Sequence, residues 1–527
     1  MSLKNKSTAL VPEDKKFIFV LSVIFLAAAL IRIYHLGFND FWYDEAWNLT
    51  NGKVLNVSDF ATFQTGPVFF FLLTHILFIL NSPEFVLRLV PFAFGLLSVP
   101  AIYLLASALF DRRIGLISAF FLAISPVQVY YSQEYSSYSL IVLLSILAVY
   151  FFVKMLASGK ISHQVGFVVF SILGLYTHYS VWLLLFSQNL AFFFFFRGRG
   201  ITVRRWLVIQ GIIFFLFMPH LSWSIDHMRR IVASDVFFWV PQLTLRTFLH
   251  TFGIFTLGYY ASALLYGVSL VLSLPLCLAG IRRYNNEGVK GGTYLLLIWI
   301  FLPYMLILAS GIFSKNHTHY LYRIFLYLSP AFYILSAKGL NRMAKKTVVV
   351  FILFAFIFLS AISLNNYFND KFPLPVYPYR PSIFEKKENR SASLYIKERY
   401  RKGDMILHNC RATFTPFLYY HGNKLSEKWV VTDKDIDWLH WRRFFYALPL
   451  SRVQQEWFDS VFQHGLSGLP GGHKRIWLVS AGWGLEDNPQ SDIKDLLDRQ
   501  FALVDSRAFR GIKVFLYDCP SIDGRGE

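Results

Sequence analysis

Two adjacent carboxylates, Asp44 and Glu45, stand within an aromatic segment that also contains Trp42, Tyr43 and Trp47. An acid among aromatic rings loses hydration, so keeping it ionised there costs free energy and indicates a function. A carboxylate can hold or deprotonate a hydroxyl group, and aromatic faces pack on sugar rings. The structural alternative is a helix start, at which Asn39 or Asp40 caps the helix and both acids favour its dipole.

Three further segments carry polar residues between apolar runs. Glu134 is the only charge in the tyrosine-rich segment 125–135, and His178 lies in a short turn, Thr177-His178-Tyr179. A lone histidine is more often structural than catalytic. Arg323 follows a segment containing His317 and His319. Arginine at the entrance of an apolar run either extends its head group to the membrane surface or grips a phosphate.

Together these residues suit an enzyme that uses a substrate linked to a lipid phosphate. A carboxylate serves as the base, and an arginine neutralises the departing phosphate. A lipid phosphate is a good leaving group, so a single base suffices. The sequence contains no G-x-x-x-x-G-K-[ST], H-E-x-x-H, C-x-x-C or G-x-S-x-G motif, which disfavours an NTPase, a zinc protease, a redox enzyme and a serine hydrolase.

The composition predicts that membrane helices position these residues. Of the 527 residues, 55% are hydrophobic and only 16% are charged, and the mean hydropathy is +0.44. Soluble domains carry about 25% charged residues, so a soluble enzyme is excluded, as are disordered and fibrous chains. The net charge of +19 is interpreted as basic cytoplasmic loops. No basic face with interleaved aromatic residues is present, so nucleic acid is not an expected partner.

Charges become dense after about residue 364, which predicts a membrane domain over 1–363 and a soluble domain over 364–527. Since a spanning helix needs roughly 20 apolar residues, about eleven transmembrane helices are expected. They cover 17–33, 84–109, 114–130, 138–158, 164–178, 180–196, 205–222, 261–281, 293–311, 322–340 and 347–363. The run 67–80 is shorter and is expected to lie in or along the outer leaflet.

Six basic clusters fall on one side of the membrane only if 67–80 does not span it. The positive-inside rule then predicts a cytoplasmic N-terminus and an extracytoplasmic C-terminal domain. An N-glycosylation sequon, Asn48-Leu49-Thr50, adjoins the acids, where a glycan would obstruct them. This favours a multi-pass protein of a bacterial inner membrane.

The C-terminal domain is predicted to be a small α/β domain. Helices are expected over 391–401 and 493–501, and strands over 404–409, 475–480 and 514–518. Cys410 and Cys519 adjoin strands in an oxidising compartment, so a disulfide and two free thiols both stay open.

The ordered set of motifs resembles a known family. The chain is similar to the bacterial glycosyltransferase family 39 of GT-C membrane glycosyltransferases, which is related to protein O-mannosyltransferases and to the lipid A aminoarabinose transferase. The motifs that carry the resemblance are Asp44-Glu45-Ala46, Glu84-Phe85-Val86-Leu87-Arg88-Leu89-Val90-Pro91, Tyr131-Ser132-Gln133-Glu134 with Tyr138, Thr177-His178-Tyr179, and Tyr322-Arg323 with Pro330. The resemblance covers most of the chain.

The resemblance implies a GT-C fold and inverting transfer of a sugar from a polyprenyl-phosphate donor on the outer face. It implies that Asp44 is the base and that Glu45 supports it, with Glu134 as a second acidic part of the site. Candidates for the donor phosphate are Arg323, His178, Arg88 and Gln133, and candidates for stacking on sugars are Trp42, Tyr43, Trp47 and Tyr138. No metal ligand or cofactor is required by the residues, although the resemblance allows a divalent metal.

The chain departs from the family pattern at several positions. Thr65-Gly66-Pro67 stands where the family often has His-Pro-Pro, Tyr135 and Ser136 replace Ala and Arg, and Ile324 replaces Tyr. The Arg missing at Ser136 puts donor-phosphate binding in question, unless Arg229 or Arg230 supplies the charge.

Three functions are weighed against one another. The first is transfer to a glycan or lipid, and the second is a protein O-mannosyltransferase-like reaction. The third is a lipid-linked sugar transporter or flippase, which usually shows internal repeats and ionisable residues at the membrane midplane. Acids in outer loops and the lack of a repeat favour transfer. The sugar, the carrier length and the acceptor are not encoded in any motif.

Overall fold

The computed structural model describes residues 12–54, 68–79, 83–197, 199–234, 241–282, 291–313, 320–375, 379–381, 383–421, 425–431, 462–464, 474–482 and 492–519. The chain forms two compact units. Unit 1 comprises Met1–Leu36, Arg88–Met218 and Pro241–Tyr379, and unit 2 comprises Gly37–Leu87, Pro219–Val240 and Arg380–Glu527. The predicted domain boundary between 363 and 364 stays a prediction.

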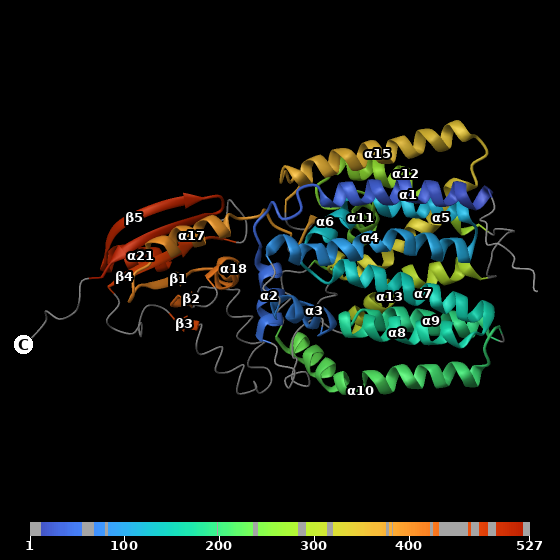
Figure 1. The fold of residues 1–527 in the computed structure, drawn as a ribbon, viewed down its shortest axis with the longest axis horizontal. Helices are drawn as coiled ribbons and strands as arrows, with labels where there is room; N and C mark the ends of the chain where they lie inside the picture. Colours follow the sequence, from blue (N-terminus) through green and yellow to red (C-terminus); the bar gives the residue numbers. More distant parts are fainter. Residues whose placement is uncertain are drawn as a thin grey trace, which may run out of the picture. The chain divides into compact units, whose positions relative to one another are not determined.

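Unit 1 is a bundle of apolar helices that run side by side (Figure 1). Helix α4 (Glu84–Leu109) begins in unit 2, and helix α10 (Val203–Ser234) ends in unit 2. The helices are α1 (Pro12–Ile33), α4 (Glu84–Leu109), α5 (Arg112–Ile124), α6 (Pro126–Gln133), α7 (Tyr138–Ser158), α8 (Ile161–Thr177), α9 (Val181–Ala191) with η2 (Phe192–Phe196), α10 (Val203–Ser234), α11 (Leu245–Leu257), α12 (Ala263–Ile281), α13 (Gly292–Phe313), η3 (Tyr322–Leu328), α14 (Ser329–Asn341) and α15 (Lys346–Phe368).

Seven helices within the described residues are long and apolar enough to cross a membrane, and eight if α5 and α6 form one bent span. The segments over α8 and α9 are shorter apolar helices. All eleven predicted spans overlap helices of the structure. The predicted membrane domain of helices is therefore confirmed, whereas the number of spans and their orientation stay predictions.

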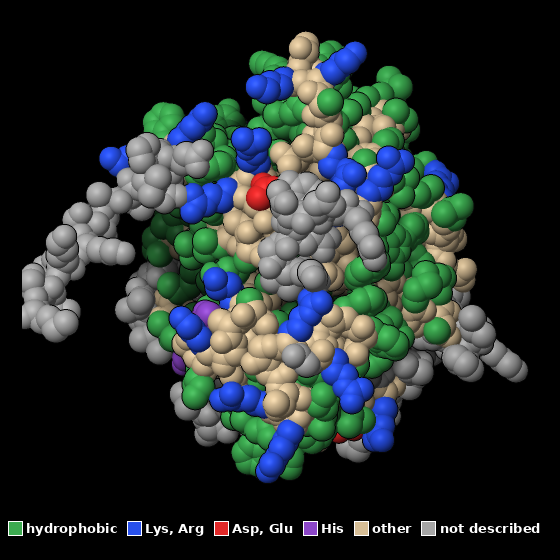
Figure 2. Space-filling view, turned by 90° about the vertical axis from the view of Figure 1, so that its right-hand side faces the viewer, with side chains coloured by type: hydrophobic (Ala, Val, Ile, Leu, Met, Phe, Trp, Pro, Cys, Tyr) green, Lys and Arg blue, Asp and Glu red, His purple; other side chains and the backbone are tan. Residues whose placement is uncertain are grey.

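Basic side chains are prominent at one end of the molecule. Figure 2 shows a face on which many Lys and Arg side chains but few acids are visible. Such a face is what the positive-inside rule predicts for a cytoplasmic surface.

The predicted span 114–130 is bent in the structure. Helix α5 ends at Ile124 and α6 begins at Pro126, with a bend of 59° between them. A proline has no N–H for the helix ladder and disfavours helical geometry in the residue before it. The segment 223–260, which lies between two predicted spans, contains helical residues at both ends. Helix α10 continues to Ser234, and Thr244 caps α11 through a capping box with Thr247.

Unit 2 contains a six-stranded sheet in the order β3-β2-β1-β4-β6-β5. The four strands β1, β2, β3 and β4 are parallel to one another, whereas β6 pairs antiparallel with both β4 and β5. The predicted α/β class is confirmed. The elements of unit 2 are α2 (Tyr43–Val54), α3 (Val68–Ile79), α17 (Asn389–Arg399), β1 (Met405–His408), α18 (Arg411–His421), β2 (Glu427–Val431), β3 (Phe462–His464), β4 (Arg475–Ser480), α21 (Asp492–Gln500), β5 (Ala502–Phe509) and β6 (Ile512–Asp518).

Alternating side chains divide the core of this sheet between its two faces. Ile406 and Trp477 pack with α17 and α18, whereas Leu407 and Leu478 pack with α21. Cys410 and Cys519 are free thiols. β5 was not predicted, because its residues are exposed and show no alternating burial.

Candidate functional site

The two adjacent acids occupy the first turn of α2 and have different environments. Glu45 is completely buried, and its Oε2 accepts a hydrogen bond from the backbone N–H of Trp42 at 3.4 Å. Asp44 is half-buried. Both acids favour the helix dipole, as the structural alternative predicted. The predicted cap is wrong, because α2 begins at Tyr43 and its N-cap position is therefore Trp42, not Asn39 or Asp40. This geometry leaves Asp44 as the more accessible carboxylate and gives Glu45 a capping role.

Residues from the C-terminal part of the chain surround the same loop. The Lys386 ammonium lies 3.5 Å from Glu45 Oε2 and 4.5 Å from the centre of the Trp42 ring. The Arg411 guanidinium lies 5.1 Å from the centre of the Tyr43 ring. Such cation–π contacts are stabilised by the negative charge of the ring face. The aromatic residues predicted to stack on sugars therefore also contact cations of the protein itself.

A second set of contacts fixes the residues just before α2. Arg390 pairs with Asp40 at 3.6 Å and with Glu84, and its backbone N–H donates to Asp40 Oδ2 at 2.8 Å. Asn389 donates to the carbonyl of Phe41 at 3.0 Å. The N–H of Phe41 donates to the Tyr420 hydroxyl at 2.9 Å. The backbone before Trp42 is thus held by α17 and α18.

In unit 1, Glu134 ends the short helix α6 and is 3% exposed. The preceding Gln133 donates from Nε2 to the carbonyls of Arg32 and Tyr34, at 2.7 and 2.6 Å. Gln133 therefore ties α6 to the end of α1.

Three other predicted residues meet near the start of α7. The Arg323 guanidinium, from η3, lies 5.6 Å from the centre of the Tyr138 ring. The ring of His178 lies 6.4 Å from that of Tyr138. His178 Nδ1 accepts the Ser180 N–H at 3.1 Å, so a neutral His178 carries its proton on Nε2. The ring of Tyr131, three residues before Glu134 in the chain, lies 4.9 Å from that of Tyr138, so the end of α6 adjoins this group.

The remaining predicted residues are placed as follows. Arg88 is buried in α4. The Trp47 ring stacks on the Tyr43 ring, and the two ring centres are 6.0 Å apart. His317 and His319 lie outside the described residues. Arg229 pairs with the exposed Asp226 at 3.5 Å, and the side chain of Arg230 is not described.

Ser136 stands where the family has arginine. It is 2% exposed, and its hydroxyl has no hydrogen-bond partner among the described residues.

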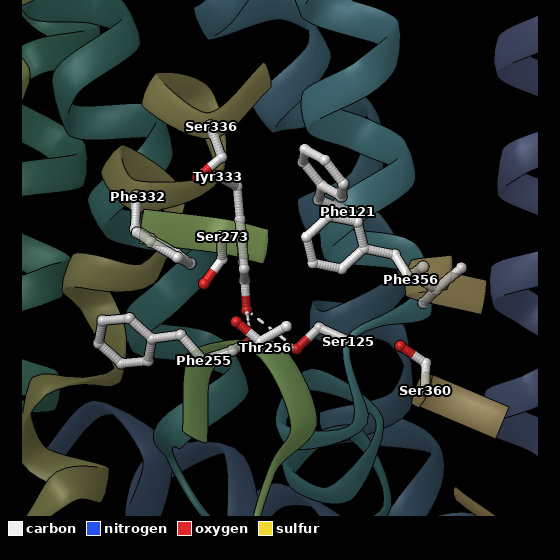
Figure 3. Close-up of a pocket in the computed structure, with 11 residues that line it drawn as sticks. Phe121, Ser125, Phe255, Thr256, Ser273, Phe332, Tyr333, Ser336, Phe356 and Ser360 are labelled. Atoms are coloured by element: carbon white, nitrogen blue, oxygen red, sulfur yellow. Dashed lines mark hydrogen bonds between the residues drawn. The ribbon is translucent and has the colours of Figure 1, made fainter. Parts of the chain in front are cut away.

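A pocket in unit 1 contains none of the predicted site residues (Figure 3). Its lining combines phenylalanines with hydroxyls from α5, α11, α12, α14 and α15. The Tyr333 hydroxyl oxygen lies 2.6 Å from the carbonyl oxygen of Phe255 and 2.9 Å from Ser125 Oγ, and its single proton can be donated to one of them. Within the described part of the chain, the hydroxyls of Ser273 and Ser336 have no partner.

The described residues do not provide an evident metal centre. No group of three or more His, Cys, Asp or Glu in the described ranges could hold a metal ion.

A buried titratable cluster lies in the sheet domain. Glu427 of β2 is 2.7 Å from His421 Nδ1 and 3.2 Å from His408 Nε2. Burial alone would raise the pKa of Glu427, but the two imidazoles outweigh it and hold that pKa below its usual value. Burial lowers the pKa of His408, although Glu427 opposes this shift.

We expect acidification to destabilise this domain. A carboxylate with a lowered pKa contributes stability above its unfolded pKa and loses it as pH falls through the folded value. A histidine with a lowered pKa also loses its contribution as pH falls below 6.5. Each pKa unit of difference is worth about 1.4 kcal/mol.

Hydrogen exchange of β1 and β2 in the full chain, followed from pH 7.5 to 4, should show faster opening at low pH. A His408→Asn variant should lose less stability between pH 6.5 and 5 than the native chain. Equal slopes for the two proteins would contradict the role of His408.

Sequence reasoning did not find the residues contributed by the C-terminal domain. Lys386, Arg390 and Arg411 stand in polar segments in which no spacing marks them as neighbours of α2. Arg32 was detectable, since a charge within an apolar span is unusual and needs a partner.

A family model described as dolichyl-phosphate-mannose-protein mannosyltransferase matches residues 64–223. No curated protein matches the sequence.

Several solved structures are similar to this chain. ArnT from Cupriavidus metallidurans, solved with bound undecaprenyl phosphate, is 12% identical to this chain with a TM-score of 0.59. The match covers 94% of this chain and 97% of the ArnT chain. Its apo state has a TM-score of 0.58. The arabinofuranosyltransferase AftD from Mycobacteria is 12% identical with a TM-score of 0.50, and the match covers 98% of this chain and 40% of AftD. At such identities the similarity shows the fold.

Proposed function

We propose that this chain, which has the fold of the GT-C membrane glycosyltransferases, transfers a sugar from a polyprenyl-phosphate donor to an acceptor hydroxyl. The fold supports the reaction class, and ArnT was solved with undecaprenyl phosphate. The observation that carries the proposal is the pair at the start of α2, where Glu45 is buried and ion-paired while Asp44 stays accessible. Transfer takes place on the outer face of a bacterial inner membrane.

In the proposed reaction, Asp44 accepts the proton of the acceptor hydroxyl. The acceptor oxygen forms a bond to the anomeric carbon while the bond from that carbon to the phosphate oxygen breaks. Attack opposite the phosphate inverts the anomeric centre, and the polyprenyl phosphate departs with the bonding electrons.

The cations proposed to receive the phosphate are in unit 1. Arg323 supplies a permanent positive charge, and His178 supplies an N–H donor at Nε2. Arg88 is assigned to donor binding, and Glu134 to the second acidic part. Gln133 is not assigned to the phosphate, because its Nε2 already donates to two backbone carbonyls. Trp42, Tyr43, Trp47 and Tyr138 are proposed to contact sugar rings.

Two classes of acceptor are considered, a glycan or lipid and a protein hydroxyl. The mannosyltransferase family model over 64–223 favours the protein acceptor as the second candidate. Acceptor peptides are therefore included beside glycan and lipid acceptors in the test.

The test is a transfer assay in lipid nanodiscs with a panel of polyprenyl-phosphate sugars. We expect Asp44→Asn to lower the rate on the order of a hundredfold or more, because the variant cannot accept the proton. Asp495→Asn, which changes an exposed carboxylate of α21, should leave the rate unchanged. Assays with and without EDTA report metal dependence.

Native activity that Asp44→Asn retains would remove Asp44 from its role. Binding of a donor without transfer by the native protein would favour a lipid-linked sugar transporter.

A further inference from the structure

The first turn of α2 is held by a segment from the C-terminal part of the sequence. Residues 383–388 have no regular secondary structure, and they precede α17. Within this segment Lys386 is 9% exposed, and its ammonium reaches the side chain of Glu45. A buried lysine is rare unless it is paired, so its place beside Glu45 indicates a specific role.

Lys386 makes two contacts that act on the same turn. Its ammonium is 3.5 Å from Glu45 Oε2 and lies 4.5 Å from the centre of the Trp42 ring. Glu45 Oε2 in turn accepts the backbone N–H of Trp42. Each of the three residues Lys386, Glu45 and Trp42 therefore contacts the other two. These contacts lie next to Asp44 in the chain.

The neighbouring charges make contacts of their own. Asp40 and Glu84 pair with Arg390, and Arg411 lies over Tyr43. Removing one partner of a buried ion pair leaves the other charge uncompensated, which is strongly unfavourable. Loss of Lys386 is therefore expected to disturb the first turn of α2.

We propose that Lys386 is a positioning residue for the proposed transfer reaction. It acts through Glu45: the ion pair fixes the first turn of α2 and thereby the direction of the Asp44 carboxylate. This role rests on the proposed function. It also makes the C-terminal domain a contributor to the catalytic loop.

The experiment compares Lys386→Met, Lys386→Arg and Glu45→Gln with a Lys386→Met/Glu45→Gln double variant. Steady-state kinetics of the full chain in nanodiscs separates kcat from KM for the donor. Because a shift of about 1 Å at a reacting group costs up to a hundredfold, we expect Lys386→Met to lower kcat about tenfold or more with little change in KM. Lys386→Arg keeps the cation and should retain most of the native kcat.

Lys386 and Glu45 should also be coupled. In the Glu45→Gln background, Lys386→Met should lower kcat much less than it does in the native chain. Lys397→Met, at an exposed position of α17, is the matched control, and thermal unfolding midpoints identify variants that fail to fold.

Additive losses in the double variant, or a native kcat in a folded Lys386→Met variant, would overturn the positioning role. Absence of turnover by the native protein with every donor would overturn the proposed function, and this role with it.

Discussion

Replacing Gly339 by alanine is expected to lower the free energy of unfolding of the helix bundle by about 3 kcal/mol. Gly339 of α14 faces α12 so closely that an added Cβ would overlap the carbonyl oxygen of Leu276. The contact is reciprocal, since a Cβ at Gly280 of α12 would overlap the carbonyl of Leu335. Both neighbours are backbone atoms, which cannot rotate away, so the two helices must separate. Small residues at such crossings are typical of membrane helices.

The measurement is the thermal unfolding midpoint of the purified chain in nanodiscs. Gly267→Ala is the matched control, because this glycine lies in α12, the helix that Gly339 faces, and a Cβ at Gly267 meets no atom within 4 Å. The control should be unchanged or slightly more stable, since alanine favours a helix over glycine by about 1 kcal/mol. Equal midpoints for both variants would show that the crossing does not limit stability.

Replacing Arg32 by methionine should destabilise the bend between α5 and α6. Pro126 has no N–H, so the Leu122 carbonyl lacks the donor that a continuous helix would provide. Arg32 Nη2 donates to this carbonyl at 3.1 Å, and Nη1 donates to the Ala123 carbonyl at 2.8 Å. Its Nε donates to Ser132 Oγ of α6 at 3.1 Å. A single side chain of α1 therefore caps α5 and fixes α6.

Each buried polar group left without a partner costs about 1–3 kcal/mol. We therefore expect Arg32→Met to lose about 3 kcal/mol or more, although methionine fills similar space. Arg32→Lys should recover only part of this loss, because an ammonium cannot span the same acceptors as a planar guanidinium.

Arg113→Met, which removes an exposed cation of α5, is the control. Hydrogen exchange at the end of α5 should rise in Arg32→Met and stay native in the control. Unchanged exchange in Arg32→Met would contradict the capping role.

Part of the candidate site was predictable because its signals are local in the sequence. Asp44 and Glu45 are adjacent, and their place in the first turn of a helix agrees with the preference of acids for that position. The proximity of Tyr138, His178 and Arg323 was expected only from the family resemblance, since the three residues belong to different helices. No local pattern states how several helices pack against one another.

The sequence by itself determined the helical bundle, because the apolar runs are long enough for the free energy of burial to select a helix in each. It also determined the buried strands β1, β4 and β6, whose side chains are largely buried. It did not determine strand β5, which is exposed, or helix α11, which none of the predicted spans covers.

Only the tertiary structure decided which charges are paired. Lys386 meets Glu45, and Arg32 meets the carbonyls of α5, across large separations in the chain. An ion pair or a capping contact depends on distance in space and on burial, and neither is a property of neighbouring residues in the sequence. The residues able to do chemistry were therefore visible in the sequence, whereas the partners that hold them were set by packing.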